Sequence, residues 1–96
     1  MITLDAYLIP VVGVIGRIVE NNEAVLVLPE KGEVKVLNEV GARIWSLANG
    51  SRTIRSIAGT ICEEFAVDLG TAETDTMAFA SDLVGRGILY MSDQPQ

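Results

Sequence analysis

The sequence predicts a small α+β protein in which a sheet is followed by helices. Up to residue 37, the apolar residues are mostly β-branched and lie in short runs separated by turn residues, which is typical of strands. From residue 38 onward, they recur at the three- and four-residue spacing of amphipathic helices. A length of 96 residues suits one domain with a modest core, so we expect residues 1–96 to form a single domain.

Two apolar strands are expected first. The run from Val11 to Val19 is rich in β-branched residues and precedes a turn at Asn21-Asn22. Ala24 to Leu28 is the second strand, and it ends at the proline and glycine of residues 29–32. The loop between the two strands is short enough for an antiparallel pair.

The third strand, Glu33 to Leu37, alternates between two faces. Val34 and Val36 point to one face, and Glu33, Lys35 and Leu37 point to the other. Because short loops join all three strands, we expect one small antiparallel sheet at the N-terminal end of the domain.

The first two helices have clear beginnings. Asn38 can cap a helix that Gly50 ends in a left-handed turn, and Thr53 can cap the next one. The apolar positions of the first are Val40, Ile44, Leu47 and Ala48, and those of the second are Ile54, Ile57, Ala58, Ile61, Cys62 and Phe65. Each set lies on one face of its helix, which predicts packing against a shared core.

A third helix is expected from near Thr71 to a stop at Gly85-Arg86-Gly87. Glu73 and Asp75 lie in its first turns, where the helix dipole favours negative charge. Residues 88–91 can add a short strand before a frayed end. This order of elements resembles a winged helix, with Trp45, Ile57, Ile61 and Leu83 assigned to the core.

The apolar run from Ala6 to Gly16 is not expected to be a targeting segment. It is too short to span a bilayer and is interrupted by Pro10 and Gly13. It also lacks the basic start of a secretory signal. We interpret it as folded chain and expect a cytoplasmic protein without a membrane partner, which the single cysteine also fits.

The residue types that most enzymes use are scarce. There is no histidine, so the commonest general base and metal ligand is missing. Cys62 lies on the apolar face of the second helix, where a buried and unreactive thiol is expected. Gly13 and Gly16 lack the lysine-serine ending of a phosphate loop. We therefore expect no catalytic residue, no metal site, no cofactor and no enzymatic activity.

The charge distribution argues against a DNA-binding protein. Residues 1–56 carry six acidic and six basic side chains, whereas residues 57–96 carry seven acidic side chains and one basic one. A winged-helix protein would place its last helix in the major groove. That helix carries Glu73, Asp75 and Asp82 here, which phosphate would repel. Three arginines on the other side, Arg43, Arg52 and Arg55, are more typical of a solvated face.

Peptide binding by strand addition is the second interpretation. An open sheet edge beside a helix forms a groove in which an extended peptide gains main-chain hydrogen bonds and side-chain pockets. The alternative is that the chain's own N-terminal segment covers this edge. The pattern of residues alone leaves both open.

Several stretches resemble the PqqD-like domains. "VLNEVGARIWSLANGSRTIRSIAGTICEEF" followed by "DTMAFASDLVGRGIL" is similar to that family in the order and spacing of its motifs. The shared motifs are a Leu-Asn strand end, a Gly-Ala-x-Ile-Trp helix, a Gly-x-Arg-Thr turn and a final Arg-Gly-Ile-Leu. The resemblance covers roughly residues 17–91.

The resemblance implies a module that recognises the leader part of a ribosomally made precursor peptide and presents it to modifying enzymes. It further implies that the leader pairs with the third strand, in a groove formed with the third helix. Carried over to this sequence, the peptide-binding residues are Glu33, Val34, Lys35, Val36, Leu37, Asp75, Met77, Ala78, Phe79 and Asp82. The two aspartates would attract basic leader residues, and Phe79 with Met77 would form an apolar wall, although both also suit a core.

The stretch "LNEVGARIW" resembles more the free-standing members that serve lasso peptide pathways, which partner a leader protease and a cyclase. The alternative is the type that serves pyrroloquinoline quinone synthesis with a radical S-adenosylmethionine enzyme. That type usually shows a Cys-Asp-Gly turn, where this chain has Leu47-Ala48-Asn49-Gly50. An apolar N-terminus and an open edge would also permit a homodimer.

The segment "YLIPVVGVIG", residues 7–16, has a spacing similar to that of lasso leaders. It is more simply explained as a strand. The sharper hypothesis is that it occupies the groove and competes with the leader, so that deletion of residues 1–10 tightens leader binding.

Overall fold

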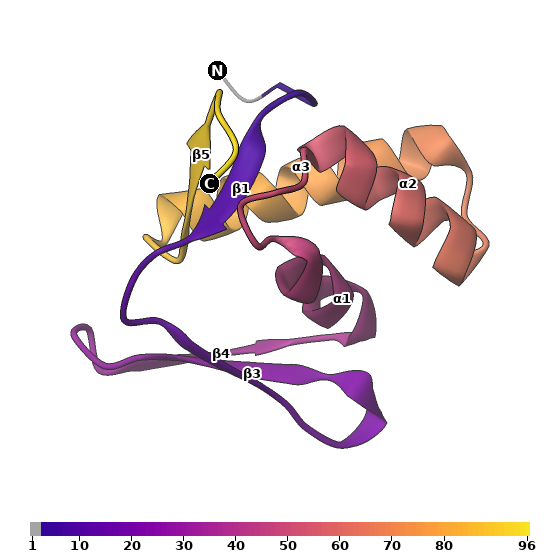
Figure 1. Cartoon of the computed structure of the whole chain (residues 1–96). Helices are drawn as coiled ribbons and strands as arrows, with labels where there is room; N and C mark the ends of the chain where they lie inside the picture. Colours follow the sequence, from indigo (N-terminus) through magenta and orange to yellow (C-terminus); the bar gives the residue numbers. More distant parts are fainter. Residues whose placement is uncertain (1–2) are drawn as a thin grey trace.

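A computed structural model describes residues 3–96 of the chain. The elements are β1 (Tyr7–Pro10), β2 (Ile15–Ile18), the 3-10 turn η1 (Glu20–Asn22), β3 (Ala24–Leu28), β4 (Glu33–Leu37), α1 (Glu39–Leu47), α2 (Ile54–Phe65), α3 (Leu69–Gly85) and β5 (Leu89–Ser92). α1 lies between a three-stranded sheet and the pair formed by α2 and α3 (Figure 1). The predicted α+β architecture, a small antiparallel sheet packed on three helices, is therefore confirmed.

The sheet has the strand order β2-β3-β4, and both pairs are antiparallel. Its inner face carries Leu26 and Leu37, which are buried against the helices. Its outer face carries Val34 and Val36, which are each 63% exposed. The predicted alternation of the third strand is thus confirmed, because only one face of this sheet has a helical layer to cover it.

The expected strand from Val11 to Val19 is shorter than predicted. Only Ile15–Ile18 pairs with β3. Gly13 adopts a φ of 98°, and the N–H of Val14 donates to the carbonyl of Val11 over 3.3 Å. This turn separates β1 from β2, because a left-handed glycine ends the extended run.

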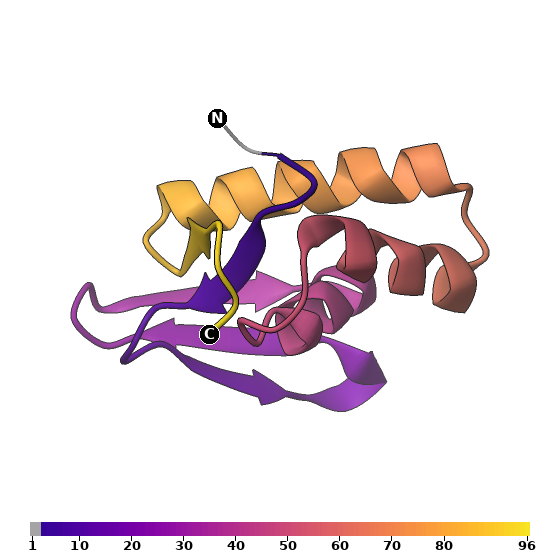
Figure 2. The ribbon, with the colours of Figure 1, turned by 45° about the horizontal axis from the view of Figure 1, so that its top comes forward.

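A second, two-stranded sheet joins the two ends of the chain. β1 pairs with β5 in antiparallel register, from Tyr7↔Ser92 to Pro10↔Leu89. The two strands lie side by side (Figure 2). β1 also contacts the loop between α1 and α2, where the Gly50 N–H donates to the Leu8 carbonyl over 2.9 Å. Residues 7–10 are therefore a structural strand, and Ser92 is paired where a frayed end was expected.

The helix caps follow the predicted chemistry. The side chain of Asn38 accepts from the N–H of Gly41 over 2.8 Å, and that of Thr53 accepts from the N–H of Ser56 over 3.1 Å. α3 begins earlier than predicted, because Asp68 caps it by accepting from the N–H of Thr71. The hydrogen bonds from Thr71 hold the pKa of Asp68 below its usual value.

One hydrophobic cluster joins the helices to both sheets. Ile57, Ile61 and Leu83 are buried in it, as predicted. Trp45 is half-buried, and its indole packs against Gly16 of β2 so closely that a Cβ at Gly16 would clash with Nε1. Cys62 packs against this cluster but is only half-buried, where a buried thiol was expected. Among the helices of residues 3–96, none is long and apolar enough to cross a membrane.

Candidate functional site

The edge of β4 is the part of the sheet that a peptide strand could extend. β4 is the last strand in the order β2-β3-β4, and β1 pairs with β5 on another sheet. Within residues 3–96, no hydrogen bond from outside the sheet reaches the backbone of β4. The described part of the N-terminal segment, residues 3–16, therefore leaves this edge uncovered.

The register identifies which backbone groups face the open edge. The N–H of Val19 donates to the directly opposite carbonyl of Glu23 over 2.8 Å, which marks a hydrogen-bonded pair at that position. Hydrogen-bonded pairs alternate along the strands, so Val25 and Val27 direct their backbone groups to β2. The backbone groups of Ala24, Leu26 and Leu28 then face β4, where these residues pair with Leu37, Lys35 and Glu33.

The same alternation leaves Val34 and Val36 with backbone groups that face the open edge. Their N–H and C=O groups form a row of two donors and two acceptors. Such a row is what an added strand requires. Glu33, Lys35 and Leu37 instead direct their side chains toward the helices on the inner face.

β4 runs beside α3 in the opposite direction. Lys35 lies 3.7 Å from Asp82, measured from Nζ to Oδ2. One end of β4 leads into Asn38 and the start of α1, where the ring of Phe79 lies against Gly41. At the other end, the Lys31 amine donates to the Arg86 carbonyl over 2.6 Å. α3 therefore approaches β4 or its flanking segments at three points, and we call the space between the open edge of β4 and α3 the groove.

A hollow with a volume of about 360 Å³ opens at the end of this groove nearest α1. We call it the Phe79 hollow. It is lined by Asn38, Val40, Gly41, Ile44, Asp75, Ala78 and Phe79. Its apolar lining and the single carboxylate of Asp75 suit an apolar side chain with a basic neighbour.

The predicted site residues divide between two places. Asp75, Ala78 and Phe79 are together in the Phe79 hollow. Asp82 lies further along α3 beside Lys35, and it also accepts from the Nε of Arg86 over 3.0 Å. Met77 does not line the hollow and packs against the hydrophobic cluster.

The sequence pattern did not identify the residues that line the hollow from the side of α1. Asn38, Val40 and Ile44 were assigned only to capping and packing, and Gly41 was given no role of its own. A Cβ at Gly41 would lie 2.9 Å from Cε1 of Phe79, so glycine is needed for this close approach. A glycine inside a helix usually marks a position of close packing, so Gly41 was the signal in the sequence that could have revealed this side of the hollow.

The arginines considered for DNA are largely paired. Arg43 forms two hydrogen bonds of 2.8 Å with the carboxylate of Glu64. These bonds raise the pKa of Arg43 and lower that of Glu64. Arg55 lies 3.2 Å from Asp5, and 4.0 Å from Glu73. This face is a set of solvated ion pairs, which leaves little free positive charge for phosphate.

Comparisons with known proteins identify a family and structures to which the chain is similar. The chain matches the family described as "Coenzyme PQQ synthesis protein D (PqqD)" over residues 23–89. A solved structure, TbiB1 in complex with the TbiA(beta) leader peptide, is 30% identical with a TM-score of 0.75. That match covers 84% of this chain and 94% of the other.

A second structure, a lasso peptide synthetase B1 complexed with the leader peptide, has a TM-score of 0.78 at 21% identity. The match covers 88% of this chain and 99% of the other, and at this identity it shows the fold alone. Among curated protein sequences, none matches the chain.

Proposed function

The chain belongs to the PqqD family, and on this premise we propose that it binds the leader region of a ribosomally made precursor peptide as an added strand on β4. The observation that carries the proposal is the open edge of β4, with the backbone groups of Val34 and Val36 directed outward beside the Phe79 hollow. Main-chain pairing along this edge supplies affinity, and the hollow supplies selectivity.

A lasso peptide pathway is the favoured setting. Both similar structures are complexes with leader peptides, and one of them is a lasso peptide synthetase B1. In this setting, the protein presents the bound leader to a leader protease and a cyclase. Precursor peptides are made on ribosomes, so this role places the protein in the cytoplasm. The alternative setting is pyrroloquinoline quinone synthesis, which the family description supports.

The protein acts as a binding module and not as an enzyme in this proposal. The peptide needs only strand pairing and side-chain contacts, and both are offered by β4 and α3. The full chain serves as one recognition domain, because a single hydrophobic cluster includes residues from β1, β3, β4 and β5 and from all three helices. The peptide-binding residues proposed on β4 are Glu33, Val34, Lys35, Val36 and Leu37, and those on α3 are Asp75, Ala78, Phe79 and Asp82, with Met77 behind them.

Fluorescence anisotropy tests this function. Labelled TbiA(beta) leader, a leader from a quinone-precursor peptide and a DNA duplex are each titrated with the full chain. We expect saturable binding of one leader and no binding of DNA. Binding of DNA alone would contradict the proposal, and the leader that binds would identify the pathway.

A variant in the hollow connects binding to this site. Phe79→Ala removes the ring that walls the hollow, and we expect it to weaken leader binding about tenfold. The matched control is Leu69→Ala, at an exposed position at the start of the same helix. If the two variants bound the leader equally well, the peptide would not use the Phe79 hollow.

A further inference from the structure

We propose that three cations near the C-terminal end of α3 select leader peptides by charge. Lys31, Lys35 and Arg86, which we call the cation cluster, favour an acidic leader side chain on the half of β4 nearest the β3–β4 turn. This inference rests on the proposed function, because it concerns the side chains of a peptide strand added to β4.

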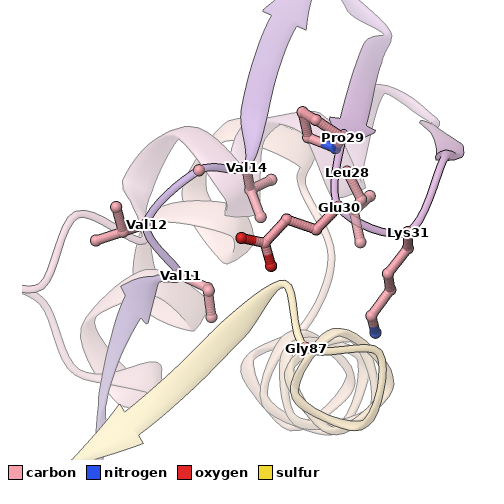
Figure 3. A pocket seen from close by; sticks show the side chains of 9 residues that line it. Val11, Val12, Val14, Leu28, Pro29, Glu30, Lys31 and Gly87 are labelled. Carbon is pink, nitrogen blue, oxygen red and sulfur yellow. The ribbon is translucent and has the colours of Figure 1, made fainter.

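The cation cluster is assembled across the groove. The Lys31 amine donates to the carbonyl of Arg86 over 2.6 Å, and Arg86 Nε donates to Asp82 over 3.0 Å. The Lys35 amine lies 3.7 Å from the same carboxylate of Asp82. Figure 3 shows Lys31 extended toward Gly87 at the end of α3. Two lysines from the sheet side therefore converge on one end of the helix.

Positive charge predominates in this group. Asp82 is shared by Lys35 and Arg86, so its negative charge is already balanced. Among residues 3–96, no carboxylate forms an ion pair with Lys31. The neighbouring Glu30 points away from it, toward Val14 (Figure 3).

If Glu33 is counted together with Asp82, the three cations of the cluster lie near two carboxylates. The net charge of this group is then +1, in a chain whose net charge is −6.

The attraction of cations to a helix C-terminus explains only part of the cluster. It accounts for Arg86, the C-cap residue of α3, and for Lys31, whose amine binds the carbonyl of Arg86. Lys35 lies in the middle of β4, on the face that looks toward α3. Alternate side chains of a strand added beside β4 project on that same face, next to the Lys35 amine.

The end of the groove nearest α1 carries negative charge instead of positive charge. Asp75 lines the Phe79 hollow, and it forms no ion pair with any residue from 3 to 96. A leader that fits both ends carries an apolar side chain over the hollow, with a basic neighbour near Asp75. It carries an acidic side chain about two to four residues further toward the β3–β4 turn. The groove therefore defines a class of leaders by the order of their charges.

Selection from a display library of random peptides tests this without a known leader. The library is selected against the full chain and against a Lys35→Met, Arg86→Gln double variant. We expect the full chain to select peptides with an acidic residue about two to four positions from an apolar anchor. A synthetic peptide with glutamate there should bind about fivefold more tightly than the same peptide with lysine. The double variant should lose this preference.

Arg52→Gln is the matched control, because Arg52 is exposed in the turn before α2 and should leave the preference unchanged. Selected peptides that tolerate glutamate and lysine equally would overturn the charge selection while peptide binding stands. A preference for lysine at that position would also overturn it. If the folded full chain selected no peptide, the proposed function itself would fail, and this inference with it.

Discussion

Replacing Val36 with proline should weaken leader binding by about thirtyfold to a hundredfold in a protein that remains folded. The N–H of Val36 faces the open edge of β4, so proline removes one of the donors that an added strand uses. The pyrrolidine ring also occupies the space that the peptide backbone would approach. A carbonyl of the leader is then buried without a partner, which adds to the loss.

The fold should tolerate this change. An outward N–H on an edge strand is the position at which proline is accepted in a sheet, and the Val36 side chain is 63% exposed. Val36→Ala is the control, because it removes most of the side chain and keeps the backbone donor. Circular dichroism and thermal unfolding establish the fold, and anisotropy gives the affinity. Equal leader affinity for the proline variant and the parent would show that the peptide does not pair with β4.

Truncating Leu8 should have the largest effect on stability. Leu8 is 0% exposed in the hydrophobic cluster, and β1 connects β5 to the start of α2. We expect Leu8→Ala to lower the free energy of unfolding by about 2 to 5 kcal/mol, through lost burial and the cavity it leaves. Urea denaturation measures this difference.

Val12→Ala is the matched control in the same segment, because Val12 is 98% exposed. This substitution should change the free energy of unfolding by no more than about 0.5 kcal/mol. The pair of variants also decides the hypothesis that residues 7–16 compete with the leader. Residues 7–10 are paired with β5 and do not cover β4, so deletion of residues 1–10 should destabilise the protein and not free its groove. A Leu8→Ala variant with unchanged stability and tighter leader binding would contradict the structure.

Local patterns in the sequence predicted the elements whose partners are close in the chain. The alternation in Glu33–Leu37 and the apolar spacing of α2 each reflect burial of one face, which a sequence records directly. The side-chain caps Asn38 and Thr53 were readable because each binds a backbone N–H only three residues along the chain.

Pairing between segments that are distant in the chain could not be predicted from the sequence. β1 and β5 lie at opposite ends of the chain, and neither carries a turn signal that relates it to the other. The Phe79 hollow likewise depends on the approach of α3 to Gly41, which no local periodicity specifies. The ion pairs of Asp82 also required the fold, because Lys35 is far from it in sequence. They change its expected role from an attractor of basic residues to a partner of the cation cluster.

Amide hydrogen exchange tests the central claim most directly, with the leader that binds in the anisotropy experiment. In the free protein, the N–H groups of Val34 and Val36 face the open edge and should exchange quickly, whereas that of Lys35 is bonded to β3. Saturation with the leader should protect Val34 and Val36. Gly16 and Ile18, which face the opposite edge of the sheet, should stay unprotected. Protection of Gly16 and Ile18 instead, with Val34 and Val36 unchanged, would show that the leader binds the other edge.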